Sequence, residues 1–217
     1  MPSRGDYQTF LTEFLRNYHT TGAIIPSGRA LASALCRHVG RGAGAQRILE
    51  AGPGTGAVTA CIIERMHHDD RLWMVERNPT FAAHLRRAFE EKPLFKTAAP
   101  RCRLVEGSVH QLGPLGPTVD DGQFDLVVSG LPLNNFSSED VREILQAYSR
   151  LLKPGGILSF FQYILIRPAR MYVSVGSERD RLRQVGEAIE GMLSEREFAR
   201  EWVWPNVPPA WVHHVRF

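Results

Sequence analysis

The sequence predicts an α/β fold, a doubly wound and mainly parallel seven-stranded sheet with antiparallel strands at its C-terminal edge and an N-terminal helical cap. Three observations predict it. Apolar strand-like runs alternate with helix-like segments along most of the chain. A glycine-rich turn joins the first run to the first helix of this alternation. Two further runs follow the last helix close together, which favours an antiparallel addition at one edge of the sheet.

The strands are predicted from short apolar runs that end in glycine or polar residues. The parallel strands are expected at 47–51, 72–76, 102–106, 124–129 and 157–166. The run 124–129 is apolar except at Asp125 and Ser129, as expected of a parallel strand covered on both faces. The two closing strands are expected at 198–203 and 211–215.

The helices are predicted from apolar spacing and from capping residues. A helix is expected directly after the glycine turn, with Val58, Cys61 and Ile62 on one face. Asn78-Pro79 places an N-cap and a first-turn proline at the start of the next helix. Ser137 with Asp140 opens another, which 153–156 should end, and 178–193 is the last.

The composition is that of a globular protein with one main domain. The chain has 217 residues, of which 43% are hydrophobic and 23% charged, and its net charge is +3. These values exclude a disordered or fibrous chain. We expect an N-terminal cap at 1–45 and the main domain at 46–217. The longest apolar run, 157–166, is half the roughly 20 residues of a membrane-spanning helix, and the three cysteines show no metal-ligand spacing.

The turn after the first strand is the strongest candidate for a ligand site. Glu50 is followed by Gly52, Gly54 and Gly56, and glycines allow a ligand to approach the backbone closely. Ligands of such sheets bind at the carboxyl ends of the strands. Glu76, twenty residues after Gly56, suits contact with a ribose hydroxyl. The turn also fits the dinucleotide fingerprint, so by itself it leaves the ligand open.

Three features together give a family resemblance. These are the segment 50–56 with Glu76, the segment 129–132 after the fourth strand, and 152–156 before the fifth. From about Arg47 onward the chain resembles the class I S-adenosylmethionine-dependent methyltransferases. More narrowly, 21–27, 50–59 and 129–133 resemble the bacterial phospholipid N-methyltransferases, which methylate phosphatidylethanolamine toward phosphatidylcholine. Related enzymes act on ornithine lipids or on the adenines of ribosomal RNA.

The resemblance implies a set of cofactor-binding residues. The glycines would lie at the amino-acid end of S-adenosylmethionine with Glu50 beneath them, Glu76 would hold the ribose, and the segment after the fourth strand would line the same edge. The implied cofactor-binding residues are Glu50, Gly52, Gly54, Gly56, Glu76, Arg77, Gly107, Ser108, Val109, Ser129, Gly130 and Leu131. Ser108 stands where many members have an acidic residue, so the adenine contact is weaker here.

Two tyrosines are the catalytic candidates. An amine must be neutral to attack a methyl group, so its proton needs an acceptor. Tyr18 lies just before the segment 21–27, and Tyr163 lies in the fifth strand. Aromatic rings also stabilise a quaternary ammonium group. Tyr163 could equally be a packed strand residue, and His110 is better explained as a surface histidine. No metal is required or indicated.

Two segments are candidates for contact with a membrane. Tyr7, Phe10, Phe14 and Tyr18 share a helical face with leucines, which suits either packing on the domain or an interfacial helix. The segment 167–183 carries five arginines against two acidic residues, which suits an anionic surface or an ordinary solvated loop.

The predicted function is therefore methyl transfer to the amino head group of a membrane lipid, phosphatidylethanolamine or an aminolipid such as ornithine lipid. We expect a cytoplasmic enzyme bound peripherally to the inner, anionic face of the membrane. The alternatives are an rRNA-type adenine N-methyltransferase and a non-catalytic protein that binds S-adenosylmethionine or membranes. No nucleic acid is expected as partner, because the chain shows no basic C-terminal extension.

Overall fold

The computed structural model describes residues 26–109, 112, 123–164, 177–204 and 209–217, with side chains from residue 28 onward except for 177–179. A seven-stranded sheet with the order β3-β2-β1-β4-β5-β7-β6 forms its centre. The first five strands in sequence are parallel, and β7 pairs antiparallel with both β5 and β6. The predicted fold class, with its antiparallel C-terminal edge, is confirmed.

The strands lie close to their predicted positions. They are β1 (Arg47–Ala51), β2 (Arg71–Glu76), β3 (Cys102–Glu106), β4 (Phe124–Ser129), β5 (Leu152–Tyr163), β6 (Glu197–Val203) and β7 (Ala210–Arg216). The strand order changes direction between β1 and β4. At this point two neighbouring strands send their chains to opposite faces of the sheet, which leaves a crevice for ligands at their carboxyl ends.

The helices cover both faces of the sheet. They are α2 (Pro26–Leu35), α3 (Ala57–Arg65), α4 (Pro79–Glu91), α5 (Pro93–Ala98), α6 (Ser138–Leu151) and α8 (Ser177–Arg196), with short 3-10 turns at Ala99–Arg101 and Leu133–Asn135. The predicted caps are present. Asn78 accepts a hydrogen bond from the Thr80 amide before α4, and Ser137 and Asp140 form a reciprocal capping box before α6.

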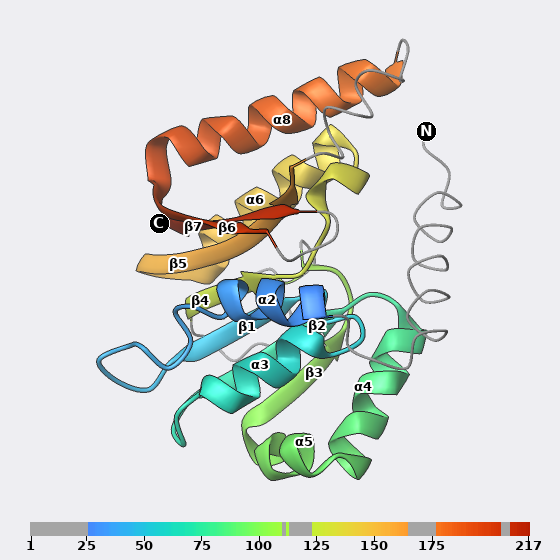
Figure 1. The fold of residues 1–217 in the computed structure, drawn as a ribbon, viewed down its shortest axis with the longest axis vertical. Coiled ribbons are helices and arrows are strands. Elements are labelled where there is room, and N and C mark those ends of the chain that lie inside the picture. The colour runs from blue at the N-terminus through green and yellow to red at the C-terminus, as the bar shows by residue number, and fades with distance from the viewer. Residues whose placement is uncertain (1–25, 110–111, 113–122, 165–176, 205–208) are drawn as a thin grey trace.

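Two apolar clusters hold these layers together. Figure 1 shows α6 and α8 on the other side of the sheet from α2 and α3. On one side Leu35 of α2 and Ile62 of α3 pack against Ile48. On the other side Ile144 of α6 and Ile189 of α8 pack against the opposite faces of the central strands. Each cluster includes side chains that are fully buried, so the hydrophobic effect fixes the position of the strand ends that form the site.

The start of β5 differs from the prediction. The sequence Lys153-Pro154-Gly155-Gly156 suggested a helix stop before a strand at 157–166, but the strand begins at Leu152 and ends at Tyr163. The register slips after Phe124 pairs with Leu152, since Leu126 then pairs with Ile157. Gly155, at φ 79°, lies in this irregular stretch, and its amide donates to the carbonyl of Phe217. Pairing of Leu152 with Phe124 and the bond from Gly155 to Phe217, the residue after β7, therefore extend the strand through residues that favour turns.

Part of the predicted N-terminal cap belongs to the main core. Leu35 and Cys36 are fully buried, and they join α2 to the cluster that also contains α3. Residues 1–25, including Tyr7, Phe10, Phe14 and Tyr18, lie outside the described residues, as do His110 and 165–176. The boundary at residue 45 stays a prediction. Among the described helices, none combines the length and apolar content that crossing a bilayer requires.

Candidate functional site

The turn after β1 adopts a conformation that requires glycine. Gly52, Gly54 and Gly56 have φ values of 70°, 55° and 84°, in the left-handed region that side chains disfavour. The amide of Gly52 donates to the carbonyl of Val75 at 3.0 Å, which ties the turn to the end of β2. A Cβ atom added at Gly54 would meet no atom of the described residues within 4 Å, so this part of the backbone is open toward them. The turn thus presents bare backbone at the carboxyl edge of the sheet.

The segment after β4 lies directly against this turn. The amide of Gly130 donates to the carbonyl of Ala51 at 2.9 Å. A Cβ atom at Gly130 would lie 2.7 Å from the Gly52 carbonyl oxygen, and one at Gly52 would lie 2.4 Å from Cδ2 of Leu131. The structure therefore places in direct contact the two segments that the sequence predicted at the same edge of the sheet, 50–56 and 129–131.

Glu76 connects the turns that follow β1 and β2. Its Oε2 accepts a hydrogen bond from the Gly54 amide at 3.0 Å, and its Oε1 accepts one from the Asn78 amide at 2.8 Å. The residue is 5% exposed, and burial raises the pKa of its carboxyl while these amide bonds oppose the rise. Each carboxylate oxygen has a second lone pair. Glu76 can therefore hold the turn and still accept a hydroxyl of a ligand.

Glu50 lies beneath the turn and is fully buried. Its Oε2 accepts a hydrogen bond from the hydroxyl of Thr59 on α3 at 2.7 Å, and its Oε1 has no partner among the described residues. Burial raises the pKa of Glu50 to about 8, because a charged carboxylate loses its hydration. At neutral pH the carboxyl is therefore mostly protonated. Thr59 was not singled out from the sequence, although its place one helical turn into α3 faces Glu50.

The segment after β3 lies beside Glu76. The Gly107 amide donates to the Glu76 carbonyl at 3.0 Å. Val109 is buried, Ser108 is half-buried, and Arg77 is exposed at the start of the turn after β2. The residues predicted to flank the adenine thus lie at the same carboxyl edge of the sheet as the glycine turn, because β1, β2 and β3 are parallel neighbours.

A buried polar pair supports the segment after β4. The Tyr148 hydroxyl on α6 donates to Oγ of Ser129 at 2.8 Å, and both residues are fully buried. Close by in sequence, Asn134 is 7% exposed and its Oδ1 has no partner among the described residues. Tyr148 lies on the buried face of α6, and only the packing of this helix on the sheet brings its hydroxyl to the end of β4.

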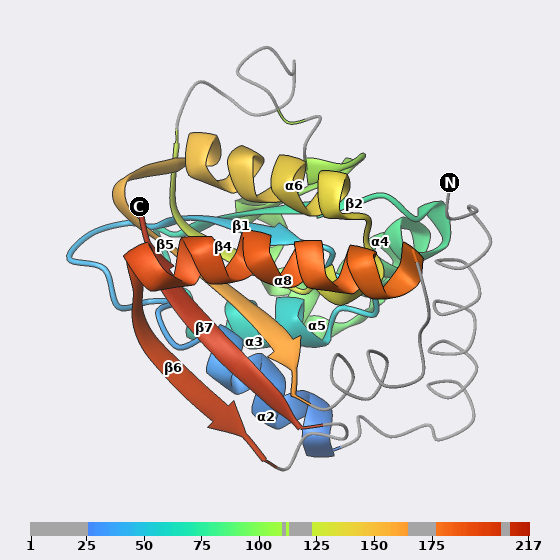
Figure 2. The same cartoon turned by 90° about the horizontal axis from the view of Figure 1, so that it is seen from above.

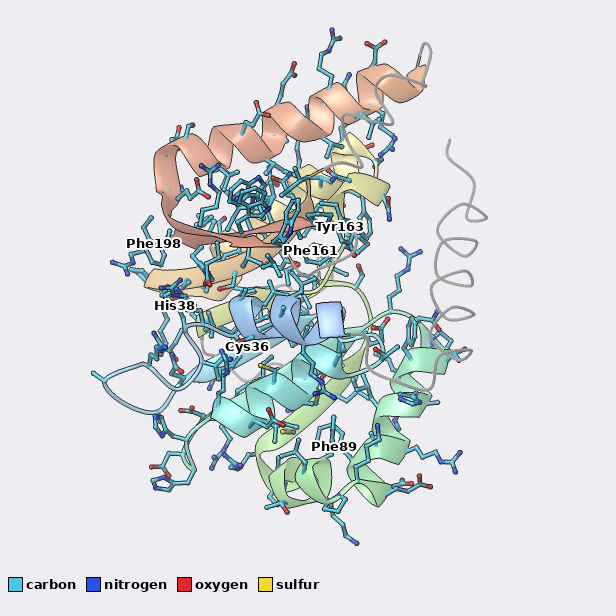
Figure 3. The ribbon with its side chains drawn as sticks, in the orientation of Figure 1. Cys36, His38, Phe89, Phe161, Tyr163 and Phe198 are labelled. Atoms are coloured by element: carbon cyan, nitrogen blue, oxygen red, sulfur yellow. The ribbon has the colours of Figure 1, made fainter. Side chains whose placement is uncertain are left out.

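Of the two catalytic candidates, the structure describes Tyr163. It lies at the carboxyl end of β5, half-buried, with its ring 5.0 Å from that of Phe161 (Figure 3). Burial raises the pKa of its hydroxyl, so the phenol is neutral at physiological pH. Tyr18 lies outside the described residues. Within the described ranges, no three histidine, cysteine or acidic side chains gather closely enough to hold a metal ion.

Known proteins are similar to this chain in sequence. Residues 48–156 match the model of the methyltransferase domain family. The chain is 32% identical to an ornithine lipid N-methyltransferase of Singulisphaera acidiphila over 151 residues, which cover 70% of this chain and 74% of the relative. It is 38% identical over 85 residues to a probable ribosomal RNA small subunit methyltransferase A of Haloarcula marismortui, covering 39% and 25% of the two chains.

Solved structures show the same architecture. A putative O-methyltransferase from Klebsiella pneumoniae has a TM-score of 0.64 and 20% identity, with coverage of 100% of this chain and 91% of the other. An O-methyltransferase from Bacillus cereus, solved in complex with SAH, has a TM-score of 0.64 and 15% identity, with coverage of 100% and 93%. At these identities the likeness shows the fold. The sequence matches show the family, and the chain belongs to the methyltransferase domain family.

Proposed function

We propose that this protein transfers methyl groups from S-adenosylmethionine to the amino head group of a membrane lipid, either phosphatidylethanolamine or a related aminolipid such as ornithine lipid. The observation that carries this proposal is the 32% identity to an ornithine lipid N-methyltransferase across 74% of that enzyme's length. The match spans 151 residues, which is longer than the segment 48–156 that the family model covers. The similarity therefore extends beyond the cofactor-binding part of the chain.

The residues at the carboxyl edge fit S-adenosylmethionine. The open backbone at Gly54 leaves room for the amino-acid part of the cofactor, and Glu76 has lone pairs left for the ribose hydroxyls. The unpartnered Oε1 of Glu50 lies beneath the same turn. Gly107, Ser108 and Val109 would flank the adenine. When bound, the cofactor supplies a methyl group on a positively charged sulfur that a neutral amine can attack.

The protein's own contribution is to position the amine and to receive its hydrogen bonds. Positioning alone lowers the barrier of such a displacement by several kcal/mol. Burial raises the pKa of Tyr163, so its phenol keeps its proton at neutral pH. It is therefore suited to orienting the amine through a hydrogen bond and not to accepting the amine's proton. The buried Asn134 Oδ1, after β4, is a second acceptor at this edge. Tyr18, which precedes α2 in the chain, completes the proposed catalytic set.

The proposed location is the inner face of the membrane, with peripheral attachment to its anionic surface. The substrate head group lies at that surface, so the enzyme has to meet it there. The two segments that suggested membrane contact, 7–18 and 167–183, fall mostly outside the described residues. Their role remains part of the proposal.

The function is tested by supplying labelled S-adenosylmethionine with defined substrates. Purified protein is incubated with phosphatidylethanolamine, ornithine lipid or phosphatidylcholine, each dispersed in detergent, and the lipids are separated. We expect label in one or both primary-amine lipids and none in phosphatidylcholine, whose nitrogen is already fully methylated. A Gly130→Ala variant serves as control, because its added Cβ collides with the backbone of the cofactor turn.

Adenine methylation in ribosomal RNA is the second candidate. The match to the Haloarcula marismortui protein favours it, although that match covers only 25% of the relative. Ribosomal RNA added to the same assay distinguishes the two. Label in RNA and none in lipid would overturn the lipid proposal, and cofactor binding without label in either would favour a non-catalytic binding protein.

A further inference from the structure

Three of the four tryptophans of the chain gather where β6 ends and β7 begins. The ring of Trp202 lies 5.3 Å from that of Trp204 and 5.4 Å from that of Trp211. Trp202 is 57% exposed and Trp204 is 67% exposed, the highest values among the large apolar side chains of the described residues. We call Trp202, Trp204 and Trp211 the tryptophan cluster. Exposing two indole rings to water costs free energy, and contact with a partner or a membrane would recover it.

The cluster and the cofactor turn both lie at the carboxyl ends of the parallel strands. Trp211 pairs with Trp202 on one side and with Gln162, next to Tyr163, on the other. These residues stand at the carboxyl end of β5, which runs parallel to β1 and β4. In Figure 2 the arrowhead of β6 and the start of β7 lie at the lower rim of the molecule, clear of α8. A surface that met the tryptophans would therefore face the same carboxyl edge of the sheet at which the cofactor turn lies.

The geometry of the rings excludes one obvious occupant. An aromatic cage for a methylated ammonium group needs rings set apart around the cation. Here the indoles contact one another, and the guanidinium of Arg200 already lies over the Trp211 ring at 4.7 Å from its centroid. No space between the rings is left for a ligand. The cluster is a continuous apolar surface with a cation at its border.

The charge at this border points to an anionic partner. Arg200 makes no ion pair with any described residue, and it stacks on Trp211 on the exposed face of the hairpin. Glu201 points to the opposite face, where it pairs with Arg37 at 2.9 Å and with His214 at 3.1 Å. Glu197 lies on the same face as Arg200, but its carboxylate contacts His213 at 2.6 Å. Arginine and tryptophan side by side suit the headgroup region of a bilayer, where indoles take up interfacial positions and lipid phosphates accept hydrogen bonds.

We propose that the tryptophan cluster with Arg200 is a bilayer-binding surface, seated in the headgroup region so that the carboxyl edge of the sheet faces the lipid that it methylates. The choice of a bilayer as occupant rests on the proposed function. The surface is formed by the edge hairpin of the sheet, β6 and β7, and includes no residue of the segments 7–18 and 167–183.

Intrinsic fluorescence tests this directly, because Trp73, the fourth tryptophan, is 7% exposed and packs against Phe124 in the core. The full-length protein is mixed with vesicles of phosphatidylcholine and phosphatidylglycerol whose acyl chains carry bromine near the headgroup. Bromine quenches only indoles that it approaches closely. We expect quenching and a blue shift of the emission, without any added cofactor. Emission that is unchanged by brominated vesicles would overturn the proposal.

A variant series identifies the surface. In co-sedimentation with the same vesicles, Trp202→Ala/Trp204→Ala should bind about tenfold more weakly than wild type, as expected for loss of two interfacial indoles. Phe198→Ala is the matched control. It removes an aromatic side chain of the same strand that is 42% exposed but lies on the opposite face, 5.5 Å from the His38 ring (Figure 3). Equal loss of binding in both variants would overturn the assignment.

Two further measurements distinguish failure of this proposal from failure of the proposed function. Methyl transfer to detergent-dispersed aminolipid reports on the chemistry alone, so its failure with intact vesicle binding would reject the function and leave the surface standing. Sedimentation velocity of the wild type reports on self-association. A wild type that dimerises through the cluster, and that becomes monomeric in the double variant without any change in vesicle binding, would show that a second copy covers these tryptophans and would overturn the bilayer assignment.

Discussion

Replacing Glu50 by glutamine should make the ligand-free protein more stable, and the gain should grow with pH. The Glu50 carboxyl is fully buried and has one oxygen without a partner among the described residues. Burial raises its pKa from an ordinary value of 4.5 to about 8. In the unfolded chain the carboxyl ionises freely. Folding at neutral pH therefore requires Glu50 to take up a proton, which glutamine avoids while its amide oxygen still accepts the Thr59 hydroxyl.

The size of the effect follows from the two pKa values. A raised pKa in the folded state means that Glu50 contributes its full stability below pH 4.5 and loses it as the pH rises to about 8. The loss is about 1.4 kcal/mol for each pH unit in this window. The cost reaches about 3 kcal/mol at pH 7 and levels off near 5 kcal/mol above pH 8. Glu50→Gln should recover amounts of this order.

Urea unfolding followed by circular dichroism at pH 5, 7 and 9 measures the difference. Wild type and Glu50→Gln should have similar free energies of unfolding at pH 5 and should diverge at pH 7 and 9. Glu143→Gln is the matched control, because this residue is exposed on α6 and should show no divergence. A difference between Glu50→Gln and wild type that does not change with pH would refute the reasoning, since it would mean that Glu50 is ionised in the folded protein.

Three other substitutions test separate parts of the site. Gly130→Ala should abolish binding of labelled S-adenosylmethionine in equilibrium dialysis, because the added Cβ lies 2.7 Å from the Gly52 carbonyl; Gly191→Ala, where a Cβ meets nothing within 4 Å, should bind normally. Tyr148→Phe should lower the free energy of unfolding by about 1 kcal/mol, the usual value of a buried hydrogen bond, and an unchanged urea midpoint would mean that its bond to Ser129 is not stabilising. Tyr18→Phe should lose most of its turnover on aminolipid and keep its affinity for S-adenosylmethionine; unchanged turnover would remove Tyr18 from the catalytic role.

Local signals in the sequence predicted much of the fold. The strands 102–106 and 124–129 were predicted at their observed bounds, and the Asn78 and Ser137 caps mark the observed helix starts. These features depend on residues close together in the chain, where propensity and capping act directly. The glycine turn and the segment after β4 were likewise predicted as one site, because parallel strands bring their carboxyl ends to one edge.

Features that depend on pairing between distant residues were not predicted. Leu152 begins β5 because β4 and Phe217, the residue after β7, supply backbone partners to a stretch whose Pro154 and Gly155 favour a turn. The tryptophan cluster depends on the hairpin register that sets Trp202 opposite Trp211, and no local pattern specifies that register. Similarly, the Tyr148 hydroxyl reaches Ser129 only after α6 has packed on the sheet.

The contact between Gly52 and Gly130 has a consequence for motion in the site. The two segments meet backbone to backbone, with a hydrogen bond from the Gly130 amide to Ala51 and no room for even a methyl group between them. Glu76 clamps the turn after β2 to the same unit through the amides of Gly54 and Asn78. The loops that follow β1, β2 and β4 are therefore joined into one connected unit. Because each loop is bonded to the others through backbone amides, moving one of them would break contacts with the rest, so we expect this unit to keep its conformation when the cofactor binds.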